Sequence, residues 1–184
     1  MKRKVLCIAI LLILGTVVSS AQEASYGVRI GANFSSISSD DIPEDLEDSR
    51  LGIVVGFLAE YPINEKFSIQ PEFQFSSLGN DDETLRVDYL QLPIFLKYNL
   101  SEMFNIHVGP QAGLKIWEWE DNQGLEANFE TFNFAAVAGI GVNITENFFA
   151  DLRYGFGISN IIDDELTDVE GNTRNIQLSV GYKL

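Results

Sequence analysis

The sequence has very few residues with a thiol or imidazole side chain. Its 184 residues include one cysteine, Cys7, and one histidine, His107. A disulfide framework needs at least two cysteines, and zinc-type sites draw on several cysteine or histidine ligands. Because no serine or aspartate can be placed beside His107 from sequence, it is interpreted as a hydrogen-bonded interior side chain and not as a general base. We therefore expect no catalytic residues, no metal site and no cofactor.

Positive charge is also scarce. The chain has 12 Lys and Arg against 27 Asp and Glu, which gives a net charge of −15. Binding to nucleic acid depends on Lys and Arg contacts to phosphate, so the composition argues against a nucleic-acid partner. Helix-period segments of useful length are absent beyond the first residues of the chain, and this predicts an all-β fold.

The first residues are typical of a secretory signal peptide. Basic residues 2–4 precede an apolar stretch at 5–18 and the small residues 19–21. The apolar stretch is short for a membrane-spanning helix, which needs about 20 residues. We therefore predict a signal peptide at 1–21 and a single β-barrel domain at 22–184. Removing the signal would change the net charge from −15 to −18.

Apolar and polar residues alternate along most of the remaining chain. In the last eleven residues, Ile176, Leu178 and Val180 alternate with Gln177 and Ser179. A period of two residues indicates a β-strand with one apolar and one polar face. The same signal recurs often enough to predict eight strands, at about 26–36, 51–61, 67–76, 90–99, 104–116, 132–144, 148–159 and 174–184.

The connections between these strands alternate in length. Three are tight repeats of the pattern apolar–Asn/Ser/Thr–Glu–x–Phe, at Ile63–Phe67, Leu100–Phe104 and Ile144–Phe148. Short turns at one rim and long loops at the other are typical of outer-membrane barrels. The other four are long and polar and hold 19 of the 27 acidic residues, at about 39–50, 79–86, 118–130 and 161–173.

The polar face is the one that suits the inside of a narrow barrel. An eight-stranded barrel has an interior just wide enough for side chains, and 11 of the 15 glycines fall on the polar face. These glycines would make room for a few long charged side chains of both signs. We predict a structural charge network that plugs the lumen, formed by Arg29, Glu60, Glu72, Lys97, Lys115, Asp151 and Arg153.

The apolar face would then meet lipid. Phe67, Phe104 and Phe148 recur where strands leave the short turns, and Tyr61 and Tyr98 where strands enter them. This placement predicts an aromatic girdle at one membrane interface. A soluble barrel would instead direct these apolar side chains into its lumen. The face assignment therefore favours an antiparallel, up-and-down transmembrane barrel.

Prolines interrupt three of the expected strands. Pro71, Pro93 and Pro110 have no backbone N–H to donate, so we expect bulges or strand ends there. Trp117 and Trp119 are interpreted as part of an interface belt and not as a sugar-binding platform.

Two acidic segments raise the question of calcium. Residues 40–48 and Asp163–Glu165 offer oxygen ligands, but neither has the spacing of a helix–loop–helix calcium site. They are interpreted as solvated surface charge.

Four segments of the chain are characteristic in combination: Phe67–Gly79, Tyr89–Tyr98, Val108–Gly113 and Asp151–Asn160. They resemble the PorT-like family of outer-membrane β-barrels of Gram-negative bacteria. The likeness spans about 26–184 and implies an eight-stranded barrel in the outer membrane, without implying a defined activity.

These observations predict a non-enzymatic protein of the cell outer membrane with a structural or surface-interaction role. Its expected partners are outer-membrane lipid, the barrel-assembly machinery during insertion, and an extracellular ligand or protein at the acidic loops. Two alternatives stay open at this point. One is a secreted, soluble, lipocalin-like barrel that binds a ligand, and the other is a lipid-modifying enzyme of the outer leaflet.

Overall fold

The computed structural model describes residues 24–38, 49–79, 86–118, 130–159 and 172–184. Within these ranges, no helix is both long enough and apolar enough to cross a lipid bilayer. The described residues form eight strands: β1 (Ser25–Ser38), β2 (Arg50–Pro62), β3 (Phe67–Gly79), β4 (Arg86–Asn99), β5 (Phe104–Glu118), β6 (Phe132–Asn143), β7 (Phe148–Gly157) and β8 (Asn172–Lys183).

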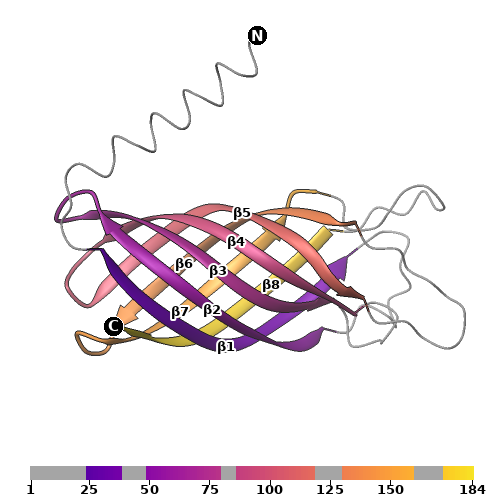
Figure 1. Cartoon of the computed structure of the whole chain (residues 1–184), viewed down its shortest axis with the longest axis horizontal. Coiled ribbons are helices and arrows are strands. Elements are labelled where there is room, and N and C mark those ends of the chain that lie inside the picture. The colour runs from indigo at the N-terminus through magenta and orange to yellow at the C-terminus, as the bar shows by residue number, and fades with distance from the viewer. Residues whose placement is uncertain (1–23, 39–48, 80–85, 119–129, 160–171) are drawn as a thin grey trace, which may run out of the picture.

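The strands form a closed, up-and-down barrel (Figure 1). Each strand pairs antiparallel with its neighbours in sequence, and β1 also pairs with β8, for example Ile30 with Val180. Closure leaves no unpaired sheet edge. The predicted fold class and strand number are confirmed. The expected boundaries of the long connections were too wide, because β5 continues to Glu118 and β8 already begins at Asn172.

Burial follows the predicted alternation along the strands. Ile30 is 53% exposed beside Arg29 at 2%, and Leu178 is 56% exposed beside Gln177 at 2%. Alternate residues of a barrel strand point into and out of the lumen, so the apolar face lies outside. The soluble lipocalin-like alternative is therefore wrong, because such a barrel would carry its apolar face inside around a ligand.

The expected bulges at the three prolines are also wrong. Each proline lies inside a strand, and the register is unchanged on either side of it. Pro71 pairs with Ile94 of β4 but not with β2, and Pro110 pairs with Ala136 of β6 but not with β4. A proline therefore loses its ladder partner on one side and keeps it on the other, which the closed sheet tolerates. The register shift in the β4–β5 pair lies elsewhere, between Asp88 and Tyr89.

The three short turns share one hydrogen-bond pattern. The side-chain oxygen of Ser101 accepts the backbone N–H groups of Met103 at 3.3 Å and Phe104 at 3.0 Å. Asn64 and Thr145 do the same in their own turns. A short polar side chain that bonds the backbone two or three residues on stabilises a tight turn. This explains the Asn/Ser/Thr position of the sequence repeat.

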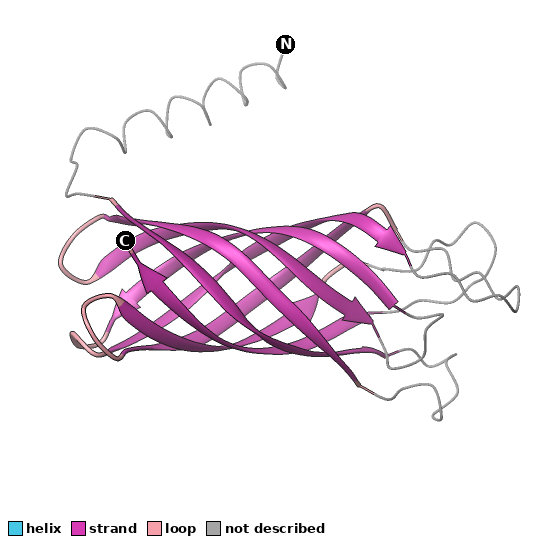
Figure 2. Cartoon of the chain, turned by 60° about the horizontal axis from the view of Figure 1, so that its bottom comes forward, coloured by secondary structure: helices cyan, strands magenta, loops and turns pink. Residues whose placement is uncertain are grey.

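The short turns lie at the same end of the barrel, which we call the short-turn rim (Figure 2). Each turn is also hydrogen-bonded, through its backbone, to the end of the next strand that runs to this rim. The carbonyl of Lys66 accepts the N–H of Asn99 at 2.8 Å, and the carbonyl of Met103 accepts that of Asn143 at 2.8 Å. The carbonyl of Asn147 accepts the N–H of Lys183 at 2.7 Å. The rim is thus continuous around much of the barrel.

Leu178→Arg tests which face meets lipid. We expect the substitution to destabilise the barrel in lipid vesicles by about 2–4 kcal/mol, because it places a charge on the lipid face near mid-strand. Leu184→Arg, at the short-turn rim, should cost about 0–1 kcal/mol. Urea-dependent folding into vesicles measures both. Equal effects at the two positions would contradict the assignment.

Alanine substitutions at Gly109 and Gly141 test how closely neighbouring strands pack against these two glycines. A Cβ at Gly109 would collide with the backbone of Ile94 and Phe95, whereas one at Gly141 would meet only the side chain of Asn105. We expect Gly109→Ala to cost about 1–3 kcal/mol, since the backbone cannot move aside easily. Gly141→Ala should cost less and be rescued by Asn105→Ala in the same urea assay. A rescue of Gly109→Ala by Asn105→Ala would be inconsistent with this packing.

Candidate functional site: the charged lumen

The middle of the lumen holds two arginines and two carboxylates, which we call the central cluster. Glu72 binds Arg153 through both carboxylate oxygens, at 2.7 and 2.8 Å, and binds Arg29 at 2.9 Å. Asp151 contacts Arg29 at 3.1 Å and the Nε of Arg153 at 2.9 Å. The four side chains are 0–3% exposed and come from β1, β3 and β7. Their formal charges cancel, as buried charges require.

Neutral polar side chains add further hydrogen bonds to the central cluster. Gln70 donates to Glu72 at 2.6 Å, and Ser179 donates to Asp151 at 3.0 Å. The guanidinium of Arg153 also lies 4.5 Å from the ring centroid of Phe95, which is a cation–π distance. The cluster therefore spans the lumen from wall to wall.

Inward glycines make room for these large side chains. A Cβ at Gly139 would collide with His107 and Arg153, and a Cβ at Gly181 would collide with the ring of Phe149. Each glycine thus lies opposite a long or aromatic side chain on a neighbouring strand. This is the packing that the glycine pattern predicts for a narrow interior.

A second group, which we call the rim cluster, lies towards the short-turn rim. One carboxylate oxygen of Glu60, Oε2, binds the ammonium groups of Lys97 at 3.0 Å and Lys183 at 2.9 Å. Ser68 donates to the other oxygen at 2.9 Å. Lys183 was not among the predicted network residues. The strict alternation of β8 could have predicted an inward Lys183, since Lys183 lies on the same face as Gln177 and Ser179.

The predicted network is therefore divided. Six of its seven residues fall into the central and rim clusters. Lys115 lies on β5 eight residues beyond His107, which is roughly 26 Å along a strand, and its backbone pairs with Tyr89. Near that other end Arg50 contacts Asp88 at 3.7 Å and donates to the carbonyl of Leu78 at 2.6 Å. Sequence reasoning had assigned Arg50 to a loop.

Comparison with known proteins identifies the family. The family model described as "Outer membrane protein beta-barrel domain" matches residues 20–163. The chain belongs to the outer-membrane β-barrel domain family. This membership places the barrel in the outer membrane, in agreement with the sequence prediction. No curated protein matches the chain.

Solved outer-membrane barrels share the fold of this family member. The attachment invasion locus protein Ail of Yersinia pestis is 17% identical, with a TM-score of 0.54 over 89% of this chain and 100% of Ail. Ail in complex with the heparin analogue sucrose octasulfate gives a TM-score of 0.56, at the same identity and coverage. Neisserial surface protein A is 17% identical, with a TM-score of 0.52 over 89% of this chain and 100% of that protein. At these identities the likeness concerns the fold alone.

Aromatic side chains surround this outer-membrane barrel at the short-turn rim. The rings of Phe67 and Tyr98 lie 4.9 Å apart between centroids, as do those of Phe148 and Tyr182. All four belong to the outward face, and three of them, Phe67, Tyr98 and Phe148, are residues of the predicted girdle. Trp117, at 63% exposed, also faces outward on β5. Trp119 and both candidate calcium segments lie outside the described residues.

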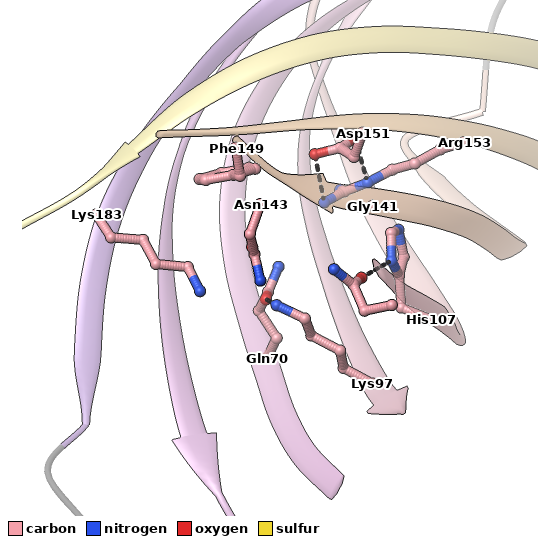
Figure 3. Close-up of a pocket in the computed structure, with 10 residues that line it drawn as sticks. Gln70, Lys97, His107, Gly141, Asn143, Phe149, Asp151, Arg153 and Lys183 are labelled. Atoms are coloured by element: carbon pink, nitrogen blue, oxygen red, sulfur yellow. Dashed lines mark hydrogen bonds and ion pairs between the residues drawn. The ribbon is translucent and has the colours of Figure 1, made fainter. Parts of the chain in front are cut away.

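His107 lies inside the barrel, buried at 5% exposure. Its Nδ1 is 3.3 Å from the side-chain oxygen of Asn105 (Figure 3). Its ring packs edge-on against Phe95, with 5.0 Å between the ring centroids. Among the described residues, no three His, Cys, Asp or Glu side chains gather as a metal site. These surroundings fit an interior hydrogen-bonded histidine.

Glu72→Ala tests the central cluster. We expect a loss of about 3–5 kcal/mol of folding stability, because both arginines would lose a buried counter-ion. Glu65→Ala, on an exposed turn, should change stability by less than about 0.5 kcal/mol. Urea unfolding in lipid vesicles gives both values. Wild-type stability of Glu72→Ala would show that the cluster does not hold the barrel together.

Proposed function

We propose that this outer-membrane barrel is a non-enzymatic protein with a closed lumen, and that its long acidic loops make contacts at the cell surface. The observation that carries the proposal is the central cluster, with side chains only 0–3% exposed across the middle of the lumen. We also propose membership of the PorT-like group, on the four segments that resemble it, and removal of residues 1–21 as a signal peptide.

Closure of the lumen is supported by size and by charge. Eight-stranded barrels are normally filled by side chains, whereas barrels of about 16 strands or more leave water-filled channels. Opening a passage here would require breaking the contacts of Glu72 and Asp151 with two arginines. That would leave charged groups in a confined, poorly hydrated space, at a cost of several kcal/mol per ion.

The orientation follows from the connections. In outer-membrane barrels the short turns lie at the periplasmic side and the long loops at the cell exterior. The short-turn rim described above is therefore assigned to the periplasm. The segments at about 39–50, 79–86, 118–130 and 161–173 are assigned to the outside.

The charge of the exterior segments indicates the class of partner. They hold 19 of the 27 acidic residues and two basic ones, Arg50 and Arg86. Ail has been solved in complex with sucrose octasulfate, a polyanion. The exterior segments of this chain are themselves negatively charged, so a partner with a basic surface suits them better than a polyanion. Attraction of this kind weakens as salt screens the charges.

A lipid-modifying enzyme receives little support from the geometry. Such an enzyme needs a nucleophile and a base near the membrane surface. His107 instead lies inside the barrel, with Asn105 and Phe95 as its neighbours. Binding through the exterior segments is the better-supported role.

Planar-bilayer recording tests the closed lumen. We expect the purified protein to show no large, sustained single-channel conductance, because the central cluster fills the cross-section. Glu72→Ala should lower stability without opening a steady pore, since Arg29, Arg153 and Phe95 still occupy the space. A large, steady wild-type conductance would overturn the closed-lumen proposal.

Charge neutralisation tests the surface role. In the full chain, the acids at 40, 41, 44, 45, 47 and 48 are changed to their amides. We expect cells that display this variant to bind poly-lysine-coated beads several-fold less than wild-type cells at low salt, because exposed charges attract over about 10 Å. Heparin-coated beads should bind poorly to both.

The matched control neutralises Glu65, Glu102 and Glu146, which lie on the short turns. These carboxylates face the periplasm in the assigned orientation, so bead binding should be unchanged. A loss as large as that of the loop variant would argue against the orientation, and wild-type binding by the loop variant would argue against the surface role.

A further inference from the structure

The rim cluster carries an excess of positive charge. Lys97 and Lys183 share the single carboxylate of Glu60. The neighbouring central cluster is balanced, with two arginines on two carboxylates. The charged side chains of these two clusters therefore sum to +1, although the chain as a whole has a net charge of −15.

The two ammonium groups are held close together. Each lies about 3 Å from Oε2 of Glu60, so the two nitrogens are at most about 5.9 Å apart. An ammonium group has three hydrogen-bond donors, and the bond to Glu60 uses one of them. Lys97 directs another towards Gln70 at 3.5 Å. Donors therefore remain on both lysines for one further acceptor.

This pair of lysines lies at the inner end of an open cavity. The cavity has a volume of about 440 Å³ and is lined by Glu60, Lys97 and Lys183, by Asn99 and Asn143, and by the short turns. A narrow pocket continues inward from Lys97, Lys183 and Asn143 to His107, and it stops at Asp151 and Arg153 of the central cluster. In Figure 3 the side-chain nitrogens of Lys97, Lys183 and Asn143 are directed towards a common space.

The other charges at this mouth are exposed. Glu65, Lys66 and Glu102 lie on the short turns and contact solvent. Their influence at the inner end is screened by water and salt. Lys97 is buried and Lys183 is partly buried, so both act at closer range and in a lower dielectric, where a charge interaction is stronger.

We propose that this cavity is an oxyanion-binding site open to the periplasm, in which Lys97 and Lys183 bind one phosphate or carboxylate group. The side-chain nitrogen of Asn143 already donates to the carbonyl of Glu102 at 2.9 Å, and its second N–H donates to the bound group. The occupant neutralises the excess charge of the rim cluster. The central cluster closes the inner end of the site, so the group enters and leaves on the short-turn side and does not cross the membrane.

Binding is measured on the refolded barrel in a non-ionic detergent, by calorimetric titration with inorganic phosphate and, separately, with acetate. Ionic strength is held constant with chloride. We expect saturable binding of at least one of the two oxyanions. Preference for phosphate or for acetate tells whether the site takes phosphate groups or carboxylates. Absence of saturable binding for both would overturn the proposal.

Two substitutions change the site in opposite directions. Lys183→Met should weaken binding about tenfold, which corresponds to one lost charge contact of about 1.4 kcal/mol. Glu60→Gln should strengthen binding several-fold, because both lysines then lack their shared carboxylate. The matched controls are Lys66→Met and Glu65→Gln, which make the same charge changes on the exposed turn. Both controls should stay within about twofold of wild type.

The controls separate a built site from general attraction. Equal weakening by Lys66→Met and Lys183→Met would overturn the proposal, as would equal strengthening by Glu65→Gln and Glu60→Gln. If Lys183→Met does not fold, the comparison of Glu60→Gln with Glu65→Gln decides alone. The result is independent of the loop experiments, since all four substitutions lie on the periplasmic side.

Discussion

The closing pair of strands is the constraint on which the structure depends. A lipid bilayer offers no partner for backbone N–H and C=O groups, so a sheet can cross it only when it has no open edge. Here β1 pairs with β8 along Gly27–Ser38 and Asn172–Lys183, and this pairing joins the two ends of the chain's strand order. Closure then fixes the diameter, and the diameter fixes how much side-chain volume the lumen can hold.

The lumen charges follow from that narrow diameter. Glu72 and Asp151 can be buried because Arg29 of β1 and Arg153 of β7 form ion pairs with them. The glycines opposite them allow the long side chains to extend across the centre. The outer face meets a simpler requirement, since any apolar side chain serves against lipid. Specific side-chain contacts are therefore concentrated in the lumen. The outer face requires only that apolar residues occupy every second position of each strand.

The two ends of the barrel carry different chemistry. The short-turn rim is built from three copies of one turn, each bonded through the backbone to the end of a neighbouring strand, and its cavity has Lys97 and Lys183 at the inner end. The long-loop segments are strongly acidic in sequence. A barrel closed at its centre, as we propose, would keep these ends independent, with one facing periplasmic oxyanions and the other a basic surface. This division goes further than membership of the outer-membrane barrel family and is specific to these residues.

The sequence by itself determined the strand number, the inward and outward faces and the location of the short turns, because each rests on a local pattern. Alternation assigned Arg29 and Leu178 to their correct faces, and the repeat around Asn64, Ser101 and Thr145 marked the turns.

Which charges meet depends on the folded barrel and could not be predicted from a local pattern. Arg29 and Glu72 are 43 residues apart in sequence, and Glu60 and Lys183 are 123 apart, so their contacts arise from barrel closure and strand stagger. The same stagger separated Lys115 from the predicted network and brought in Lys183. Pairing on both sides of each strand keeps Pro71 and Pro110 in register, because the ladder on one side continues where the proline interrupts the other.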